Sequence, residues 1–531
     1  MLRSMKKMFK ETSWLWFSLL LLMPAAFASK CLAAGVTIVT HGLNGNTDDW
    51  VAAMVGKMGE HPKLPGTNSS CYEIYFANVA GSYFITQRRV SGVPATNNHS
   101  GEIFIRLDWR QLANDSYSTY QVAVPVASAL LSTNFIPELG GRALAEFPLH
   151  LVGHSRGGSL MCEISRLLGE NGVWVDHLTT LDPHPLNNDG FLEILYSVVD
   201  APARVYRNVL FADNYWQDLN ILAYGEPLTG AFNRKLLYLA GGYASLTASH
   251  SDAHLWYHGT IDLATPATDS VATITQSERN DWWTFAEASG ATVGYKYSRI
   301  AGGDRFSSFA PAGDEAPRDG VNQIWNFGAG SSFNRTPLTN NAGLWPNPIR
   351  FFLTSTNRLT VGENISVTLY HQSAPANNTT VAVQFYLDPD GNPLNSNAIL
   401  VSQGTATTTG PTIVANFPIS LPTSLTNTPA GDYRLLVKMT YAGKSRFTYG
   451  NQVVTVLSQA GPSLALIPPL SHPYGIRINS VPGLKVVLQW STNLSSWVSI
   501  GTNTLSTATW DAVDSTSAAS SRRFYRALVV P

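Results

Sequence analysis

The stretch VGHSRGG, residues 152–158, places a serine between two glycines at the spacing G-x-S-x-G. Because 42 of the 531 residues are glycine, the motif alone is weak evidence and its surroundings decide its meaning. The apolar run PLHL precedes it and the helical pattern LMCEISRLLG follows, as required for a sharp strand-to-helix turn that exposes a nucleophilic hydroxyl. The helix N-terminus also stabilises negative charge at the serine. We therefore predict that Ser155 is a nucleophile rather than a structural turn residue.

A second turn is suited to bind the oxyanion that such a nucleophile creates. The apolar segment VTIVT, residues 36–40, leads directly into His41-Gly42-Leu43. We expect the backbone N–H groups of Leu43 and Arg156 to donate to the developing oxyanion. Losing one such donor typically costs about 3 kcal/mol of transition-state stabilisation.

A serine nucleophile also needs a histidine base and an acid that orients it. The segment SHSDAHLWYHGTI, residues 249–261, holds three of the twelve histidines. Of these, His250 and His254 are the candidates for the base. Two aspartates follow predicted strands and are candidates for the acid: Asp182 in LTTLDPHP and Asp213 in VLFADNYWQD.

Four short motifs together resemble the lipases of the α/β-hydrolase fold, especially the pancreatic-lipase-like branch: VTHGL, GHSRGG, TLDPH and H-x5-W-Y-x2-T-I. In that branch the acid lies in an L-D-P sequence. Its histidine precedes an aromatic pair by six and seven positions and a Ser/Thr-Ile pair by ten and eleven. The resemblance therefore implies His250 as base and Asp182 as acid, with His254 and Asp213 as alternatives. It covers roughly residues 35–265.

The order of sequence patterns predicts an α/β fold followed by all-β modules. Apolar runs alternate with helical patterns from about residue 35, which predicts an α/β-hydrolase fold with a mostly parallel sheet over 35–346, including a decoration at 265–346. Short alternating strands predict an immunoglobulin-like β-sandwich over 347–460 and a small β module over 461–531. The expected strands of the first domain are 36–40, 71–79, 102–109, 149–153, 177–182, 204–213 and 235–241, and its expected helices include 119–132 and 159–169. Residues 80–100 are expected to form a loop, and the segment AGDYRLLV is interpreted as strand-edge packing.

Composition limits the partners and the location. The net charge is -1 with 13% charged residues, which argues against a nucleic-acid partner. Residues 1–28 have a basic start, an apolar stretch and Ala-Phe-Ala, so we expect a cleaved signal peptide, export from the cytoplasm and no transmembrane segment in the mature chain. The three cysteines lack the ligand spacing of a zinc site, and we expect no metal and no organic cofactor.

These observations predict a secreted serine hydrolase that cleaves carboxylic esters, with acyl lipids as the expected substrates and with the triad Ser155, Asp182 and His250. One alternative is an acyltransferase or a hydrolase of polymer esters. Another is a non-catalytic surface or adhesion protein that contacts surfaces or glycans through its β modules.

Overall fold

The computed structural model describes residues 35–60, 68–96, 101–188, 196–220, 223–283, 293–298, 335–339, 345–353, 357–360, 367–373, 379–408, 414–415, 428–457, 461–468, 471–480, 482–520 and 522–530. The signal peptide expected at 1–28 and much of the decoration expected at 265–346 lie outside these residues.

The first half of the chain forms an eight-stranded sheet in the order β3-β2-β4-β1-β5-β6-β7-β8. Neighbouring strands are parallel, except that β2 and β3 form an antiparallel hairpin at one edge. The central strands are buried on both faces, which explains their continuous apolar runs. The strands are β1 (Val36–Thr40), β2 (Ser70–Val79), β3 (Ser82–Gly92), β4 (Ile103–Asp108), β5 (Leu149–His154), β6 (Val175–Leu181), β7 (Val209–Trp216) and β8 (Phe232–Lys235).

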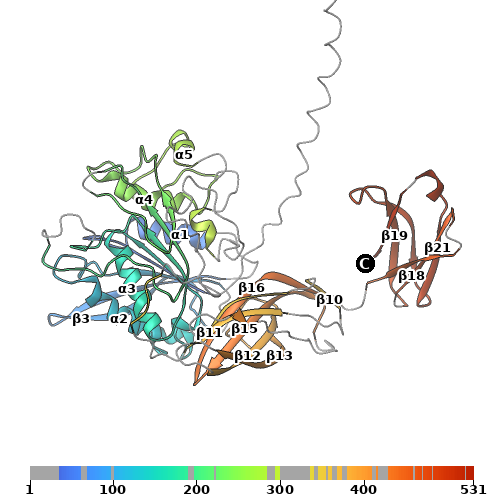
Figure 1. Cartoon of the computed structure of the whole chain (residues 1–531), viewed down its shortest axis with the longest axis horizontal. Coiled ribbons are helices and arrows are strands. Elements are labelled where there is room, and N and C mark those ends of the chain that lie inside the picture. Colours follow the sequence, from blue (N-terminus) through green and yellow to red (C-terminus); the bar gives the residue numbers. More distant parts are fainter. Residues whose placement is uncertain are drawn as a thin grey trace, which may run out of the picture.

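Helices pack on both faces of this sheet (Figure 1). Successive strand residues point to opposite faces, so Ile38 belongs to the core under α2 and α3, whereas Val39 belongs to the core under α1 and α4. The helices are α1 (Trp50–Glu60), α2 (Thr119–Leu131), α3 (Arg156–Glu170), α4 (Ala248–Gly259) and α5 (Gln276–Trp282), with short 3-10 helices at Pro137–Leu139, Leu144–Glu146, Gly294–Tyr297 and Ser517–Ala519.

The next strands form two sheets, β10-β16-β15-β12-β13 and β14-β11-β9, that share one apolar core. Leu369 of one sheet and Val383 and Val437 of the other are buried in that core, as in a β-sandwich. The strands are β9 (Pro346–Leu353), β10 (Arg358–Thr360), β11 (Val367–Ser373), β12 (Thr379–Asp388), β13 (Ile399–Thr408), β14 (Val414–Ala415), β15 (Gly431–Tyr441) and β16 (Lys444–Leu457).

The interpretation of AGDYRLLV as strand-edge packing is wrong. This segment starts β15, which lies inside its sheet between β16 and β12. Tyr433 is buried, and its hydroxyl donates to the backbone oxygen of Pro429 at 2.8 Å. A tyrosine bonded to backbone a few residues upstream is typical of the corner of immunoglobulin-like sandwiches.

Buried polar contacts join this sandwich to the first sheet. Arg446 of β16 donates to the backbone oxygens of Trp174 at 2.9 Å and Phe147 at 3.1 Å. Asn347 of β9 donates to the backbone oxygen of Gly172 at 2.9 Å and accepts from the backbone N–H of Trp174 at 2.9 Å. These bonds satisfy backbone groups that the contact between the two parts would otherwise leave buried and unpaired.

The last strands form two small sheets, β17-β18-β21 and β20-β19-β22. Ile478 of β18 and Leu488 of β19 are fully buried in a shared core. The strands are β17 (Ser463–Ile467), β18 (Tyr474–Asn479), β19 (Lys485–Ser491), β20 (Val498–Thr504), β21 (Thr509–Asp514) and β22 (Phe524–Val529).

The sequence predicts an α/β-hydrolase fold with a mostly parallel sheet, followed by β modules. For the chain as a whole, this prediction of the fold class is wrong. Of the described residues, 40% lie in strands and 19% in helices, and four of the five sheets formed by these residues are built of strands from Pro346 onward. The chain is therefore mostly β, with sandwich-type sheets and few helices. The physical reason is that sheets in its second half cover one another, so they need no helices to bury their apolar faces. None of the helices in the described ranges combines the length and hydropathy that a bilayer crossing requires.

Candidate active site

Ser155 occupies a strained turn between β5, which ends at His154, and α3, which begins at Arg156. Its φ of 57° and ψ of -131° lie in a region that L-residues rarely adopt. Close approach of the neighbouring backbone requires glycine here. A Cβ on Gly42 would lie 2.6 Å from the Cβ of Ser155, and one on Gly157 would lie 2.3 Å from the backbone oxygen of His41. The turn therefore has the form expected of a nucleophile elbow.

Asp182 and His250 meet beside this turn. The backbone N–H of Ser155 donates to the backbone oxygen of Leu181 at 2.9 Å. Leu181 is the last residue of β6, so the next residue, Asp182, lies at the same edge of the sheet as Ser155. His250 lies in the first turn of α4, and its Nδ1 is 2.7 Å from Oδ2 of Asp182. Because a carboxylate only accepts hydrogen bonds, Nδ1 carries the proton and Nε2 is left as the basic nitrogen. Ser155 and His250 line one cavity of about 450 Å³.

Gln217, just after β7, holds the carboxylate of Asp182 and was missed in the sequence. Its side-chain Nε2 donates to Oδ2 at 2.8 Å, and its backbone N–H donates to Oδ1 at 3.1 Å. Asp182 is fully buried, so these bonds stabilise its charge and fix its orientation. The only available signal was the position of Gln217 at the carboxyl end of the strand next to β6.

His154, the residue before Ser155, was also missed. Its Nε2 donates to the backbone oxygen of His250 at 2.8 Å and so ties the start of α4 to the elbow. Burial, with the neighbouring His250 as a smaller cause, holds the pKa of His154 well below its usual range. The ring therefore remains neutral, and it positions His250 without placing a second positive charge beside it. The signal lay inside the motif G-H-S-R-G itself.

The two residues expected to supply the oxyanion hole come from two separate segments near Ser155. Leu43 lines the cavity, in a turn closed by a bond from the backbone N–H of Gly45 to the oxygen of Gly42 at 3.2 Å. Arg156 is the first residue of α3, and the first N–H groups of a helix lack an acceptor within it. Both positions suit a donor to an oxyanion in the cavity.

The side chain of Arg156 points away from this chemistry and anchors the elbow. It is fully buried and pairs with Asp200 through Nε at 2.6 Å and through Nη2 at 2.8 Å. Asp200 also accepts from the backbone N–H groups of Thr119 at 2.8 Å and Leu186 at 2.9 Å. One buried carboxylate thus connects α3, the start of α2 and a loop that lines the cavity.

We expect the substitution Asp200→Ala to lower the free energy of unfolding of this part of the chain by roughly 3–5 kcal/mol, because it leaves a buried guanidinium without its partner. Urea denaturation followed by tryptophan fluorescence measures the change. Asp48→Ala is the matched control, because Asp48 pairs with Arg110 at 2.6 Å but its side chain is 58% exposed. That variant should lose less than about 1 kcal/mol. Equal losses in the two variants would contradict the anchoring role.

The alternative acid and base lie elsewhere. Asp213 sits within β7, where Oδ1 is 2.9 Å from Nε2 of His177 and accepts from Thr179 at 2.6 Å. Burial raises the pKa of Asp213 to about 7. His254 stacks on Trp50 with ring centroids 4.1 Å apart, and its closest carboxylate contact is Asp269 at 4.0 Å. The structure thus brings His250 to Asp182. The alternative acid, Asp213, contacts His177, and the alternative base, His254, lies near Asp269.

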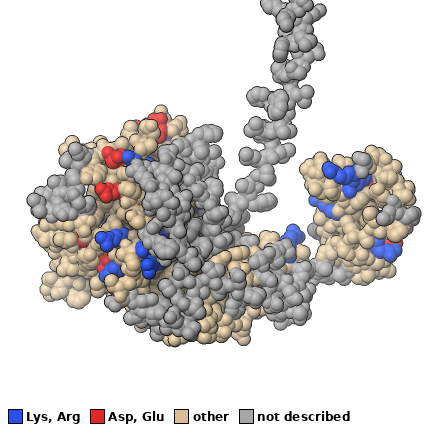
Figure 2. Space-filling view, viewed as in Figure 1, with Lys and Arg blue, Asp and Glu red and all other residues tan. Residues whose placement is uncertain are grey.

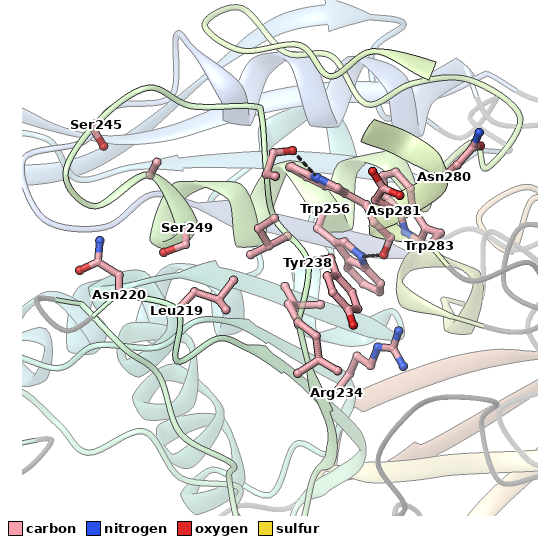
Figure 3. A pocket seen from close by; sticks show the side chains of 16 residues that line it. Leu219, Asn220, Arg234, Tyr238, Ser245, Ser249, Trp256, Asn280, Asp281 and Trp283 are labelled. Carbon is pink, nitrogen blue, oxygen red and sulfur yellow. Dashed lines mark hydrogen bonds between the residues drawn. The ribbon is translucent and has the colours of Figure 1, made fainter. Parts of the chain in front are cut away.

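A larger cavity of about 700 Å³ adjoins the start of α4 but contains none of the expected catalytic residues. Ser249 lines it, whereas the next residue, His250, lines the cavity of Ser155. Figure 3 shows Tyr238, Trp256 and Trp283 around this space, with Nε1 of Trp256 donating to the backbone oxygen of Trp282 at 3.0 Å. The candidate site is therefore chosen by the position of Ser155 and not by the size of the cavity.

Comparison with known proteins gives no family for the chain. No family model matches it, and no curated protein matches it. The solved structures that are similar to part of it include the following two. The human OSCAR ligand-binding domain is 14% identical, with 32% of this chain and 80% of that chain covered and a TM-score of 0.13. A marsupial T cell receptor is 13% identical, with 29% and 84% covered and a TM-score of 0.15.

The resemblance to lipases of the α/β-hydrolase fold is not supported. The chain is mostly β, with 40% of the described residues in strands and 19% in helices, so the assignment of the chain to the pancreatic-lipase-like branch, and with it the description as a hydrolase or lipase by family, is wrong. The physical reason is that short motifs specify only a local turn and a few side chains, and such constellations recur on unrelated folds. Any function has to be argued from the atoms of the site.

Proposed function

We propose that this protein is an enzyme that cleaves carboxylic esters through an acyl intermediate on Ser155. The observation that carries the proposal is the 2.7 Å contact between Asp182 and His250 beside a serine held at a φ of 57°. Nucleophile, base and orienting acid come from three separate segments, and they meet at one edge of the sheet. A purely structural serine would need neither of the other two groups.

The proposed reaction has two steps. His250 Nε2 takes the proton of Ser155 while Oγ attacks the acyl carbonyl, and the N–H groups of Leu43 and Arg156 stabilise the oxyanion. The protonated imidazole then gives its proton to the departing alcohol. Water, activated by the same imidazole, releases the acid from Ser155. Asp182 stabilises the imidazolium in both steps.

The cavity favours esters with an apolar acyl part. Its lining includes Leu43, Trp50, Leu186 and Val271, so apolar side chains are available to contact an acyl chain. On the face seen in Figure 2, charged groups are small and scattered. We extend the proposal to acyl lipids as the substrates. The enzyme would act on them outside the cytoplasm, because a signal peptide is expected. Analysis of the products with added alcohols distinguishes hydrolysis from acyl transfer.

The direct test is labelling of the mature full-length protein with a fluorophosphonate probe, which reacts with activated serines. We expect covalent labelling at Ser155, located by mass spectrometry of the digested protein. Ser251 lines the same cavity and should remain unlabelled. A folded protein without label at Ser155 would refute the proposal.

A second candidate is a non-catalytic surface or adhesion role, and the β content of the chain favours it. The sandwich and the last two sheets form cores of their own from the described residues, and they are separate from the site of Ser155. Such modules commonly contribute binding rather than chemistry. Binding of the full chain to glycans or cell surfaces, together with no activity on any ester, would support this role and contradict the first.

A further inference from the structure

The cavity around Ser155 is unusually rich in imidazole. Five histidines line it, His41, His154, His184, His250 and His254, whereas no lysine or arginine does so among the described residues. Imidazole is a preferred ligand of zinc and other late divalent transition ions. The absence of a fixed cation from this lining leaves such an ion without electrostatic competition.

Three residues of this cavity region bring suitable ligand atoms together. One ligand atom from each of Asp182, His184 and His250 lies within 4.8 Å of the others. Asp182 and His184 follow β6, and His250 lies in the first turn of α4. The rings of His184 and His250 are 4.9 Å apart and nearly perpendicular, at 78°, so two imidazoles approach the same space without stacking.

We propose that Asp182, His184 and His250 form a binding site for a divalent transition ion of the zinc class, and that the bound ion inhibits the enzyme. Zinc bonds to imidazole nitrogen and carboxylate oxygen are about 2.0–2.2 Å long, which places tetrahedral ligand atoms roughly 3.4 Å apart. The three ligand atoms, which lie within 4.8 Å of one another, would therefore have to approach one another by roughly 1.4 Å at most. Water then completes the coordination.

The ligand set overlaps the groups of the proposed reaction, so the ion and catalysis exclude one another. In the resting arrangement Asp182 accepts from Nδ1 of His250 at 2.7 Å. An ion bound to the carboxylate of Asp182 occupies lone pairs that would otherwise orient His250. An ion bound to the imidazole of His250 occupies the lone pair that would otherwise accept the proton of Ser155. Gln217, which donates to Oδ2 of Asp182 at 2.8 Å, holds the carboxylate as an outer-shell partner of a metal site does. The inhibitory part rests on the proposed function; the binding part does not.

The binding part is tested by titrating the mature full-length protein with Zn²⁺ in isothermal titration calorimetry. We expect one ion per chain, and an increase of at least about tenfold in the Kd of the His184→Ala variant, which loses a ligand. His254→Gln is the control, because it removes a histidine of the same cavity that lies outside the trio, and it should bind as the wild type does. Mg²⁺, which prefers oxygen ligands, should not bind at the same concentrations. No binding by the wild type, or equal binding by His184→Ala, overturns the site.

The inhibitory part is tested by the rate of fluorophosphonate labelling at Ser155 with and without saturating Zn²⁺. We expect the ion to slow labelling at least about tenfold in the wild type and much less in His184→Ala at the same concentration. Equal rates with and without the ion in the wild type overturn the inhibition. If Ser155 is never labelled, the proposed function fails, and the titration alone still decides whether the ion binds.

Discussion

Replacing Ser155 by alanine is expected to lower kcat on p-nitrophenyl esters by at least about 10⁴-fold while leaving the fold intact. Alanine lacks the Oγ that attacks the carbonyl, so no acyl intermediate forms. Alanine also has the same Cβ as serine, so it meets the same backbone constraints at a φ of 57°. The measurement is initial rates over a range of acyl lengths, with the unfolding midpoint recorded in parallel.

Ser251→Ala is the matched control for this result. Ser251 lies one residue after His250 and lines the same cavity, so its loss changes the cavity by the same single oxygen. Its kcat should stay within a few-fold of the wild type. If Ser155→Ala retained the full rate, the hydrolysis observed would come from another group, and the assignment of the nucleophile would be untenable.

The substitution Asp182→Asn is expected to lower kcat by about 10⁴-fold with little change in stability. Asn is the best available replacement, because Asp182 has a φ of 46° and Asn tolerates the left-handed region. Nδ1 of His250 and Nε2 of Gln217 both donate to Oδ2, whereas the backbone N–H of Gln217 donates to Oδ1. An amide can place its oxygen at only one of these two positions. With its oxygen at the Oδ2 position, the neutral amide no longer stabilises the imidazolium. With its nitrogen there, Nδ1 loses its proton to Nε2, and an imidazole in that tautomer cannot accept the proton of Ser155.

Asp213→Asn separates this effect from the loss of any buried carboxylate. Burial raises the pKa of Asp213 to about 7, so a neutral amide there resembles the protonated acid. Its contacts are with His177, Thr179 and Tyr215, not with His250. We expect its kcat to remain within about threefold of the wild type, as measured on the same esters and after circular dichroism confirms folding. A loss equal to that of Asp182→Asn would reverse the two roles.

Local structure around the candidate nucleophile could be predicted from the sequence. β1 covers the expected residues 36–40, and β5 and α3 flank Ser155 as the motif required. These predictions succeed because strands buried on both faces show continuous apolar runs, and because a turn this tight admits only small residues. β3 was missed, since an edge hairpin with exposed polar residues such as those of SYFITQRRV looks like a loop. The family assignment and the class of the whole chain were wrong, because the motifs say nothing about the sheets beyond Pro346.

Only the tertiary structure decided which acid meets which imidazole. Asp182 follows the end of β6, whereas Asp213 lies within β7 beside Thr179, and this difference depends on the register between strands rather than on local sequence. The contacts of Gln217 and His154 with the site, and the approach of His184 to His250, likewise join segments that are tens of residues apart. Residue types and short spacings thus specify a candidate nucleophile and its turn. Its partners are chosen by long-range packing, because only the folded chain brings the edge of the sheet and the start of α4 together.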